Sequence, residues 1–167
     1  IGRLSAWMGN AGVLLRAYIY ARLLGHEGMQ RVAEYATLNA NYLAAALKAR
    51  GFDLAFPQRR ATHEFIVTLK RQKTQLNLTA TDVAKRLIDY GFHAPTESFP
   101  VSGTFMVEPT ESEDKAEMDR FIEAMISIHG EIQQVVDGEV EEADSVVRHA
   151  PHTAAALVSD DWDHPYS

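Results

Sequence analysis

The sequence contains no cysteine, which excludes disulfide bonds and thiolate metal sites and is consistent with a reducing compartment. It also has no run of about eighteen apolar residues, so no transmembrane helix is expected. No charged and then apolar N-terminal stretch indicates a secretion signal. The first residue is Ile1 and not methionine, and we therefore treat it as a point at which a longer chain is cut.

The net charge of −7 is confined to the end of the chain. Residues 1–136 hold fifteen acidic and fifteen basic residues, whereas residues 137–167 hold eight acids and one base, Arg148. Neither part is basic, which argues against nucleic-acid binding, and no basic amphipathic helix indicates membrane binding. For residues 137–167 the sequence predicts weak burial, two short helices and partial disorder unless a partner covers them.

Two long helices are predicted before residue 52. Residues 13–24 are apolar nearly all round, as is typical of a helix buried on several sides, and Gly25 can end this helix in the left-handed conformation. Residues 27–50 form a second helix with one apolar stripe. Asn39 and Asn41 lie inside it, where asparagine is a mediocre helix former. We interpret both as exposed or capped amides.

The remaining pattern predicts the element order β-β-α-β-β-α, which gives an α/β fold class, here an α+β lobe. Residues 63–70 are apolar on both faces and belong at the centre of the sheet. Capping boxes predict helix starts at Thr79 and at Thr110, the latter with Glu113. The predicted strands are 53–56, 63–70, 92–94 and 104–107, and the predicted helices are 79–90 and 110–136.

The chain therefore divides into three parts. Residues 1–51 form an N-terminal loop and two bridging helices. Residues 52–136 form a small domain, in which a small antiparallel or mixed sheet carries helices on one face. Residues 137–167 form the acidic C-terminal tail.

Several segments together carry a family resemblance: GNAGVLLRAYIYARLLG, GMQRVAEYATLNANYLAAALK, HEF, YGFHAPT, the turn Phe99–Val101, MVEPTESE and WDHPYS. They resemble the glycine-cleavage P-protein, the pyridoxal-phosphate (PLP) dependent glycine dehydrogenase (decarboxylating). The similarity covers nearly the whole chain and continues past both ends. The N-terminal segments are closer to the form that is split into two chains, while the region after Tyr90 resembles the single-chain form equally well, so both forms stay open.

The resemblance implies a C-terminal portion of that enzyme and the C-terminal small domain of a fold type I, aspartate-aminotransferase-like, PLP enzyme. The implied reaction releases CO₂ from glycine and transfers the aminomethyl group to the lipoyl group of H-protein. PLP chemistry needs a Schiff-base lysine, and none of the lysines has the His-Lys context of the family. We expect that lysine upstream of Ile1, and we expect the fragment alone to be inactive. The lysines are Lys48, Lys70, Lys73, Lys85 and Lys115.

The implied partners are the missing N-terminal portion or a partner P-protein subunit, lipoylated H-protein and glycine. The assembly would be a homodimer or a heterotetramer, without nucleic acid or membrane. The expected location is the bacterial cytoplasm, or the mitochondrial matrix in a eukaryote. The alternative function is a stand-alone ferredoxin-like binding or regulatory module, because fold does not dictate function.

Two pairs of residues are the main candidates for lining a substrate cleft. His63 and Glu64 start the central strand, in a motif shared with the family, and are either cleft residues or a strand-edge histidine with a surface acid. His93 and Thr96 lie in a loop fixed by Pro95, which either contacts the substrate or lipoyl arm or is a structural turn.

The remaining candidates are weaker. Ser5 and Asn10 resemble the loop that follows the family's cofactor segment and could line the site. We interpret Glu108 as a dipole or cap partner of the last long helix. The tail histidines and aspartates match no zinc spacing, so we expect a solvated acidic tail and no metal site. The tail histidines are His149, His152 and His164.

Overall fold

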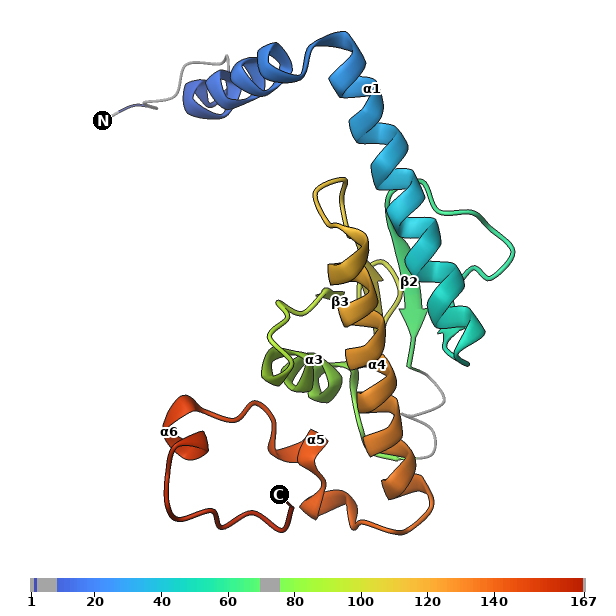
Figure 1. The fold of residues 1–167 in the computed structure, drawn as a ribbon, viewed down its shortest axis with the longest axis vertical. Coiled ribbons are helices and arrows are strands. Elements are labelled where there is room, and N and C mark those ends of the chain that lie inside the picture. The colour runs from blue at the N-terminus through green and yellow to red at the C-terminus, as the bar shows by residue number, and fades with distance from the viewer. Residues whose placement is uncertain (1, 3–8, 70–75, 167) are drawn as a thin grey trace.

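The computed structural model describes residues 2, 9–69 and 76–166. The predicted order β-β-α-β-β-α is confirmed, and a long N-terminal helix precedes it (Figure 1). The elements are α1 (Ala11–Ala49), β1 (Asp53–Leu54), β2 (Phe65–Thr68), α3 (Ala80–Asp89), β3 (Thr96–Glu97), β4 (Thr104–Val107), α4 (Lys115–Val136), the 3₁₀ turn η1 (Glu142–Asp144), α5 (Val146–His149) and α6 (Ala154–Leu157).

The four strands form one antiparallel sheet in the order β1-β2-β4-β3. The prediction that β2 is central is confirmed, since it pairs with β1 on one side and β4 on the other. In the β2–β4 register Phe65 lies opposite Val107 and Val67 opposite Phe105. These four side chains are buried, whereas Ile66 between them is only partly covered. The core therefore lies on one face of the sheet.

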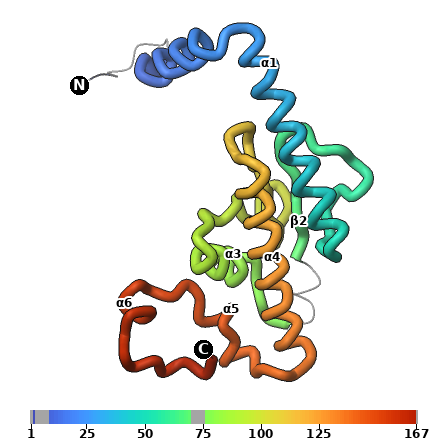
Figure 2. The backbone as a smooth tube through the Cα atoms, in the orientation of Figure 1, coloured from blue at the N-terminus to red at the C-terminus, as the bar shows by residue number. Residues whose placement is uncertain are grey.

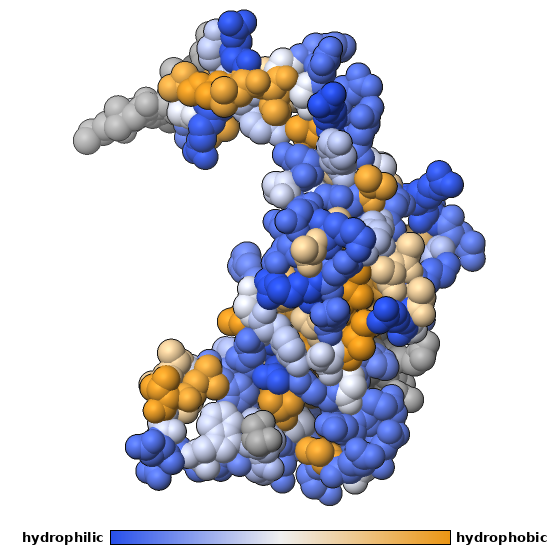
Figure 3. All heavy atoms as spheres, in the orientation of Figure 1, coloured by the Kyte–Doolittle hydropathy of each residue, from blue (hydrophilic) through white to orange (hydrophobic). Residues whose placement is uncertain are grey.

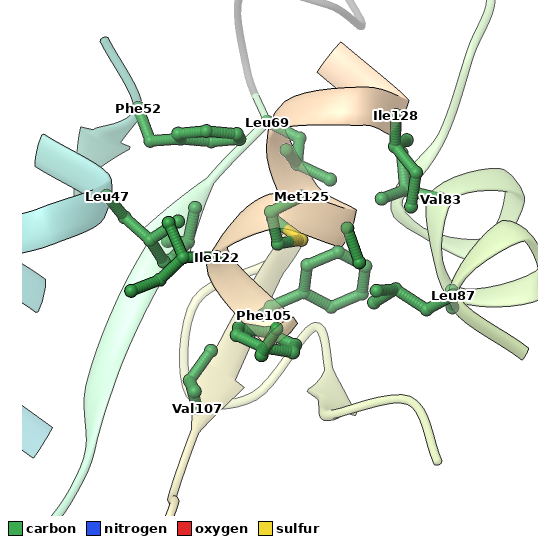
Figure 4. Close-up of a cluster of buried hydrophobic side chains, with 14 of the residues drawn as sticks. Leu47, Phe52, Leu69, Val83, Leu87, Phe105, Val107, Ile122, Met125 and Ile128 are labelled. Atoms are coloured by element: carbon green, nitrogen blue, oxygen red, sulfur yellow. The ribbon is translucent and has the colours of Figure 1, made fainter. Parts of the chain in front are cut away.

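The core joins this face of the sheet to three helices (Figure 4). Phe105 is fully buried, and Leu47 reaches the core from α1, Leu87 from α3 and Met125 from α4. Burying side chains of this size contributes about 1.5–3 kcal/mol each relative to exposure. The second half of α1 is thus an integral part of the domain.

The helix α1 is bent at Gly25, so the two predicted helices form two arms of one element. Gly25 has φ 63° and ψ −170°, which is not helical. A Cβ atom on Gly28 would lie 2.9 Å from the Leu24 Cβ, so this position also needs glycine. The arm before the bend, residues 11–24, projects from the body of the molecule (Figures 1 and 2).

Residues 11–24, which we call the N-terminal arm, expose their apolar side chains. An apolar band runs along the arm in Figure 3. The burial that the sequence predicts for this helix is therefore not provided by the described part of the chain. The exposed side chains are Val13, Leu14, Leu15, Tyr18, Ile19, Tyr20 and Leu23.

The predicted strand at 92–94 is wrong, and β3 forms at Thr96–Glu97 instead. The end of α3 explains the shift: Gly91 has φ 79°, and the Phe92 amide donates to the Leu87 carbonyl at 3.0 Å. This is a Schellman cap, so the Phe92 amide is committed to the helix. Pro95 has no amide hydrogen to donate to a strand. Thr96 is the first residue that pairs with β4.

The predicted start of α4 at Thr110 is also wrong. The N-cap is Asp114, whose carboxylate accepts from the Glu117 amide at 2.9 Å. Thr110 has φ 61°, and its hydroxyl pairs with Ser112. By contrast, the capping box at Thr79 is present as predicted. Thr79 and Thr110 both match the capping-box pattern. Thr79 caps its helix and Thr110 does not, because tertiary contacts hold the turn at Thr110.

The first part of the tail is packed on the body, which corrects the prediction of weak burial. Val147 is fully buried in the core cluster. Arg148 forms ion pairs with Asp82 at 3.0 Å and with Glu142 at 2.7 Å. The His152 ring pairs with Asp89 at 2.8 Å. The predicted short helices correspond to α5 and α6.

The end of the tail folds back on the same histidine. The His152 ring bonds to the Tyr166 hydroxyl at 2.7 Å and stacks on Trp162. Although three histidines gather here, no group of metal-ligating side chains occurs among residues 2, 9–69 and 76–166. Within the same ranges, no helix has the length and apolar character that a membrane span requires.

Attachment of the tail should weaken in acid. Burial opposes ionisation of Asp89, but hydrogen bonds from the His152 amide and ring and from Arg86 outweigh it and lower the pKa of Asp89. A carboxyl group with a lowered pKa stabilises the fold above about pH 4 and loses this contribution as the pH falls through the folded pKa. Asp89→Asn should therefore unfold more easily than wild type at pH 7, with a difference that narrows towards pH 3.

Urea unfolding between pH 7 and pH 3 measures this difference. Asp163→Asn is the matched control, because it removes an exposed tail carboxyl group. A difference between Asp89→Asn and wild type that stays constant with pH would contradict the assignment.

Two glycines with different backbone conformations test the bend: Gly25, which has φ 63°, and Gly130, which is helical. Gly25→Ala should destabilise the protein by about 1–3 kcal/mol, because alanine rarely adopts this backbone conformation. Gly130→Ala should stabilise it by about 0.4–1 kcal/mol, because Gly130 lies in α4 and a Cβ atom there meets open space. Thermal unfolding of both variants measures the contrast. Equal effects at the two positions would argue against a bend fixed by Gly25.

Candidate functional site

A hollow of about 480 Å³ opens at the end of the sheet, between β4, α4 and the loop after α3. Its lining has both apolar and polar side chains, and we call the polar set its rim. This combination suits a small polar ligand whose orientation is fixed by a few side chains. The apolar lining is Leu43, Phe92, Met106, Val107, Met118 and Phe121, and the polar lining includes His93, Thr96, Glu108, Thr110, Glu113 and Glu117.

The β2–β4 register brings the first candidate pair to this end of the sheet. Because Phe65 lies opposite Val107, the residues before β2 meet those after β4. The Nε2 atom of His63 lies 3.9 Å from a carboxylate oxygen of Glu64 and 3.9 Å from one of Glu108. Both distances exceed hydrogen-bond range. Neither His63 nor Glu64 lines the hollow itself, and Glu108 is the residue that joins them to it.

Glu108 is the residue whose role the sequence alone did not indicate. It does not cap α4, which begins at Lys115 behind Asp114. Instead it lines the hollow and faces His63. The pairing of β2 with β4 would have shown this, because it places Glu108 beside the start of β2.

The second candidate pair, His93 and Thr96, lines the hollow directly. The wall beside it is rigid, because Phe92 packs edge-on against Phe121 with ring centroids 5.3 Å apart. The Arg120 guanidinium covers the other side of the Phe92 ring at 3.8 Å and donates to a backbone carbonyl at 2.8 Å. His93 therefore stands on a fixed loop at the rim.

The two helix asparagines hold the loops around the site, which corrects their interpretation as exposed or capped amides. Asn39 is buried, and its amide donates to the Thr110 carbonyl at 2.9 Å and the Glu113 carbonyl at 3.0 Å. Asn41 donates to the Ala61 carbonyl at 2.8 Å and accepts from the Ala61 amide at 3.1 Å. Asparagine is poor in helix interiors, and that weak signal pointed to these contacts.

The weaker candidates do not join the site. Asn10 is the N-cap of α1, where its side chain accepts from the Gly12 amide at 3.0 Å and the Val13 amide at 3.2 Å. It is exposed and does not line the hollow. Ser5 lies outside the described residues.

The described lysines do not provide a Schiff-base site. Lys48 donates to a backbone carbonyl at 3.1 Å, and Lys115 pairs with Asp119 on the surface of α4. Lys85 is exposed on α3, and no lysine in the described ranges lines the hollow. Lys70 and Lys73 lie outside the described residues. The described part of the chain therefore does not provide a PLP site by itself.

The comparisons identify the kind of protein that carries this domain and hollow. A family model described as "Glycine dehydrogenase, C-terminal domain" matches residues 32–152. This match includes α1 from residue 32 onward, the whole sheet, α3, α4 and the packed part of the tail. The class is thus the C-terminal domain of an enzyme family.

Curated relatives agree over nearly the whole chain. A "Probable glycine dehydrogenase (decarboxylating) subunit 2" of Thiobacillus denitrificans is 56% identical over 96% of this chain. One of the same name from Coxiella burnetii is 58% identical over 91% of it. The "Glycine dehydrogenase (decarboxylating)" of Variovorax paradoxus is 53% identical over 100% of it. The chain belongs to the glycine dehydrogenase (decarboxylating) family.

The chain spans only part of these relatives: 32% of the Thiobacillus protein, 30% of the Coxiella protein and 18% of the Variovorax protein. Two of these relatives are named as a subunit 2, and the Variovorax protein is not.

The hydrogen bonds from Asn39 to the turn at Thr110 should contribute to the free energy of unfolding. Asn39→Ala leaves two carbonyls without their donor, and a buried unsatisfied group costs about 1–3 kcal/mol. Gln30→Ala is the matched control, since Gln30 is an exposed amide on the same helix and its side chain donates to nearby Glu34. Urea unfolding should show a large loss for Asn39→Ala and a change within about 0.5 kcal/mol for Gln30→Ala. Equal losses would contradict the assigned role.

Proposed function

We propose that this chain is the C-terminal portion of a PLP-dependent glycine decarboxylase, which releases CO₂ from glycine and transfers the aminomethyl group to the lipoyl group of H-protein. The observation that carries the proposal is the identity of 53–58% over 91–100% of the chain to relatives named for this activity. PLP, when bound, supplies the electron sink for decarboxylation. The lysine that holds it lies upstream of Ile1, and this chain alone is inactive.

The domain acts as the C-terminal small domain of a fold type I enzyme, which closes over a cofactor held by the rest of the protein. Its hollow supplies polar side chains on rigid walls at one end of the sheet. Closing such a lobe excludes water, which strengthens electrostatic interactions with the substrate. His63 and His93 make the first polar contacts with the substrate, with Thr96 beside His93 in the lining of the hollow and Glu64 beside His63 next to Glu108.

The lipoyl arm of H-protein enters along the loops of this rim. The loop at His93–Thr96 lines the hollow, and the turn at Phe99–Gly103 follows it on the way to β4. Phe99 is 62% exposed, which suits contact with an apolar arm. Glycine and lipoylated H-protein are therefore the proposed ligands of this face.

The N-terminal arm packs against the rest of the enzyme, either the missing N-terminal portion or a partner P-protein subunit. Its row of exposed apolar side chains supports this (Figure 3), because such a surface is unusual on an unpartnered domain. The complete enzyme is a homodimer or a heterotetramer, and the bacterial relatives support a cytoplasmic location.

The ferredoxin-like alternative has less support. The ferredoxin-like order is β-α-β-β-α-β, whereas this domain has β-β-α-β-β-α, in which the additional strand β1 comes first. The exposed arm also argues against a free-standing module.

Cofactor attachment tests the proposal at its centre. Borohydride reduction of the complete protein, followed by peptide mapping, should place a pyridoxyl group on a lysine upstream of Ile1. The absorption spectrum before reduction should show bound PLP. If the natural protein has its N-terminus near Ile1 and binds no PLP, the decarboxylase proposal is overturned. A label on a lysine of this chain would instead overturn the assigned position of the Schiff-base lysine.

Substitution of His63 and His93 tests whether these side chains contact the substrate. In the complete enzyme, His63→Gln and His93→Gln should each lower kcat/KM for glycine by about 10–100-fold, as expected for loss of a hydrogen bond to a charged group. His164→Gln in the tail is the control and should leave the rate unchanged. CO₂ release from glycine measures all three. Wild-type rates in both histidine variants would remove them from the site.

A further inference from the structure

We propose that Asn39 and Asn41 are positioning residues, which use α1 as a spacer to set the distance between His63 and Glu108. The inference rests on the function proposed above for the hollow. It adds a structural cause for the 3.9 Å separation of these two side chains. Neither asparagine touches the substrate on this view, and each acts through the backbone of one loop.

Asn41 fixes the loop that leads into β2. Its side-chain amide donates to the Ala61 carbonyl at 2.8 Å and accepts from the Ala61 amide at 3.1 Å. The same nitrogen also donates to the Thr37 carbonyl of its own helix at 2.7 Å. These three hydrogen bonds together fix the orientation of the Asn41 side-chain amide. His63 follows Ala61 by two residues, so this pair of bonds sets where the His63 backbone begins.

Asn39 fixes the loop that follows β4. Its amide nitrogen donates to the carbonyls of Thr110 and Glu113, and its side chain is buried, with 6% of the residue exposed. Thr110 has φ 61°, a conformation that a residue with a side chain rarely adopts without support. Glu108 precedes Thr110 by two residues, so Asn39 holds the carboxylate side of the pair.

The spacing of the two asparagines allows one helix to serve both loops. Successive residues of an α-helix are rotated by about 100°, so positions two apart point in nearly opposite directions. α1 therefore holds the His63 loop on one flank and the Glu108 loop on the other. The sheet holds the same loops at their other ends, where Phe65 pairs with Val107. Each loop is fixed at two points, and the histidine and the carboxylate lie between them.

A role confined to stability is the competing explanation, and a double-mutant cycle separates the two. In the complete enzyme, Asn41→Ala should lower kcat by about tenfold or more, with little change in KM, because displacing a positioned group by about 1 Å costs up to about 100-fold. In the His63→Gln background the same substitution should have almost no further effect, since residues that act through one another are not additive. Gln30→Ala, on the same helix, should be silent in both backgrounds.

Two measurements keep the result independent of folding. Hydrogen exchange followed by mass spectrometry should show faster exchange of residues 57–64 in Asn41→Ala, with other segments unchanged. Asn41→Asp keeps the acceptor for the Ala61 amide but sets a carboxylate oxygen against the Ala61 and Thr37 carbonyls, so its kcat should fall at least as far as that of Asn41→Ala. Asn39→Ala is examined in the same way against Glu108→Gln, with exchange of residues 108–114 as the readout.

The outcomes distinguish this inference from the proposed function. Non-additive effects with local loosening of the loop support the positioning role. If His63→Gln lowers the rate and Asn41→Ala is additive with it or has no effect, the inference is overturned while the function of the hollow stands. If His63→Gln has no effect, the assigned role of His63 fails, and the positioning role fails with it.

Discussion

The antiparallel pairing of β2 with β4 is the interaction on which the domain depends. Its register turns Phe65, Val67, Phe105 and Val107 to the same face, and α1, α3 and α4 cover that face (Figure 4). A shift of one residue would move these side chains to the other face. The same register brings the residues before β2 beside those after β4. Packing and the candidate site therefore have one common cause, and a change that slips the register would lose both.

Sequence reasoning succeeded where the controlling interactions are local. The capping box at Thr79, the end of α3 at Gly91 and the strand pattern of β2 depend on neighbouring residues. It failed at Thr110 because Asn39, far away in the chain, holds that turn in a non-helical conformation.

The candidate site shows the same division. His93 and Glu108 both line the hollow, but the neighbourhood of Glu108 and His63 depends on strand register. The burial of Val147 depends on a surface of α3 and α4 to which the tail returns, and composition alone gives no sign of that surface. The acidic character of the tail suggested solvation. Its ion pair between Arg148 and Asp82 instead uses the single base of the tail as an anchor.

The N-terminal arm differs from these cases. Its apolar sequence predicts burial, but the described residues do not cover it. Burial of apolar surface contributes about 25 cal/mol per Å², so an arm with Leu14, Leu15, Tyr18 and Leu23 exposed leaves several kcal/mol unused. Gly25 gives the arm a defined direction away from the body, which a freely jointed linker would not have. The arm is thus the free end of a bent helix that is anchored through Leu47 in the core and exposes its apolar side chains away from it.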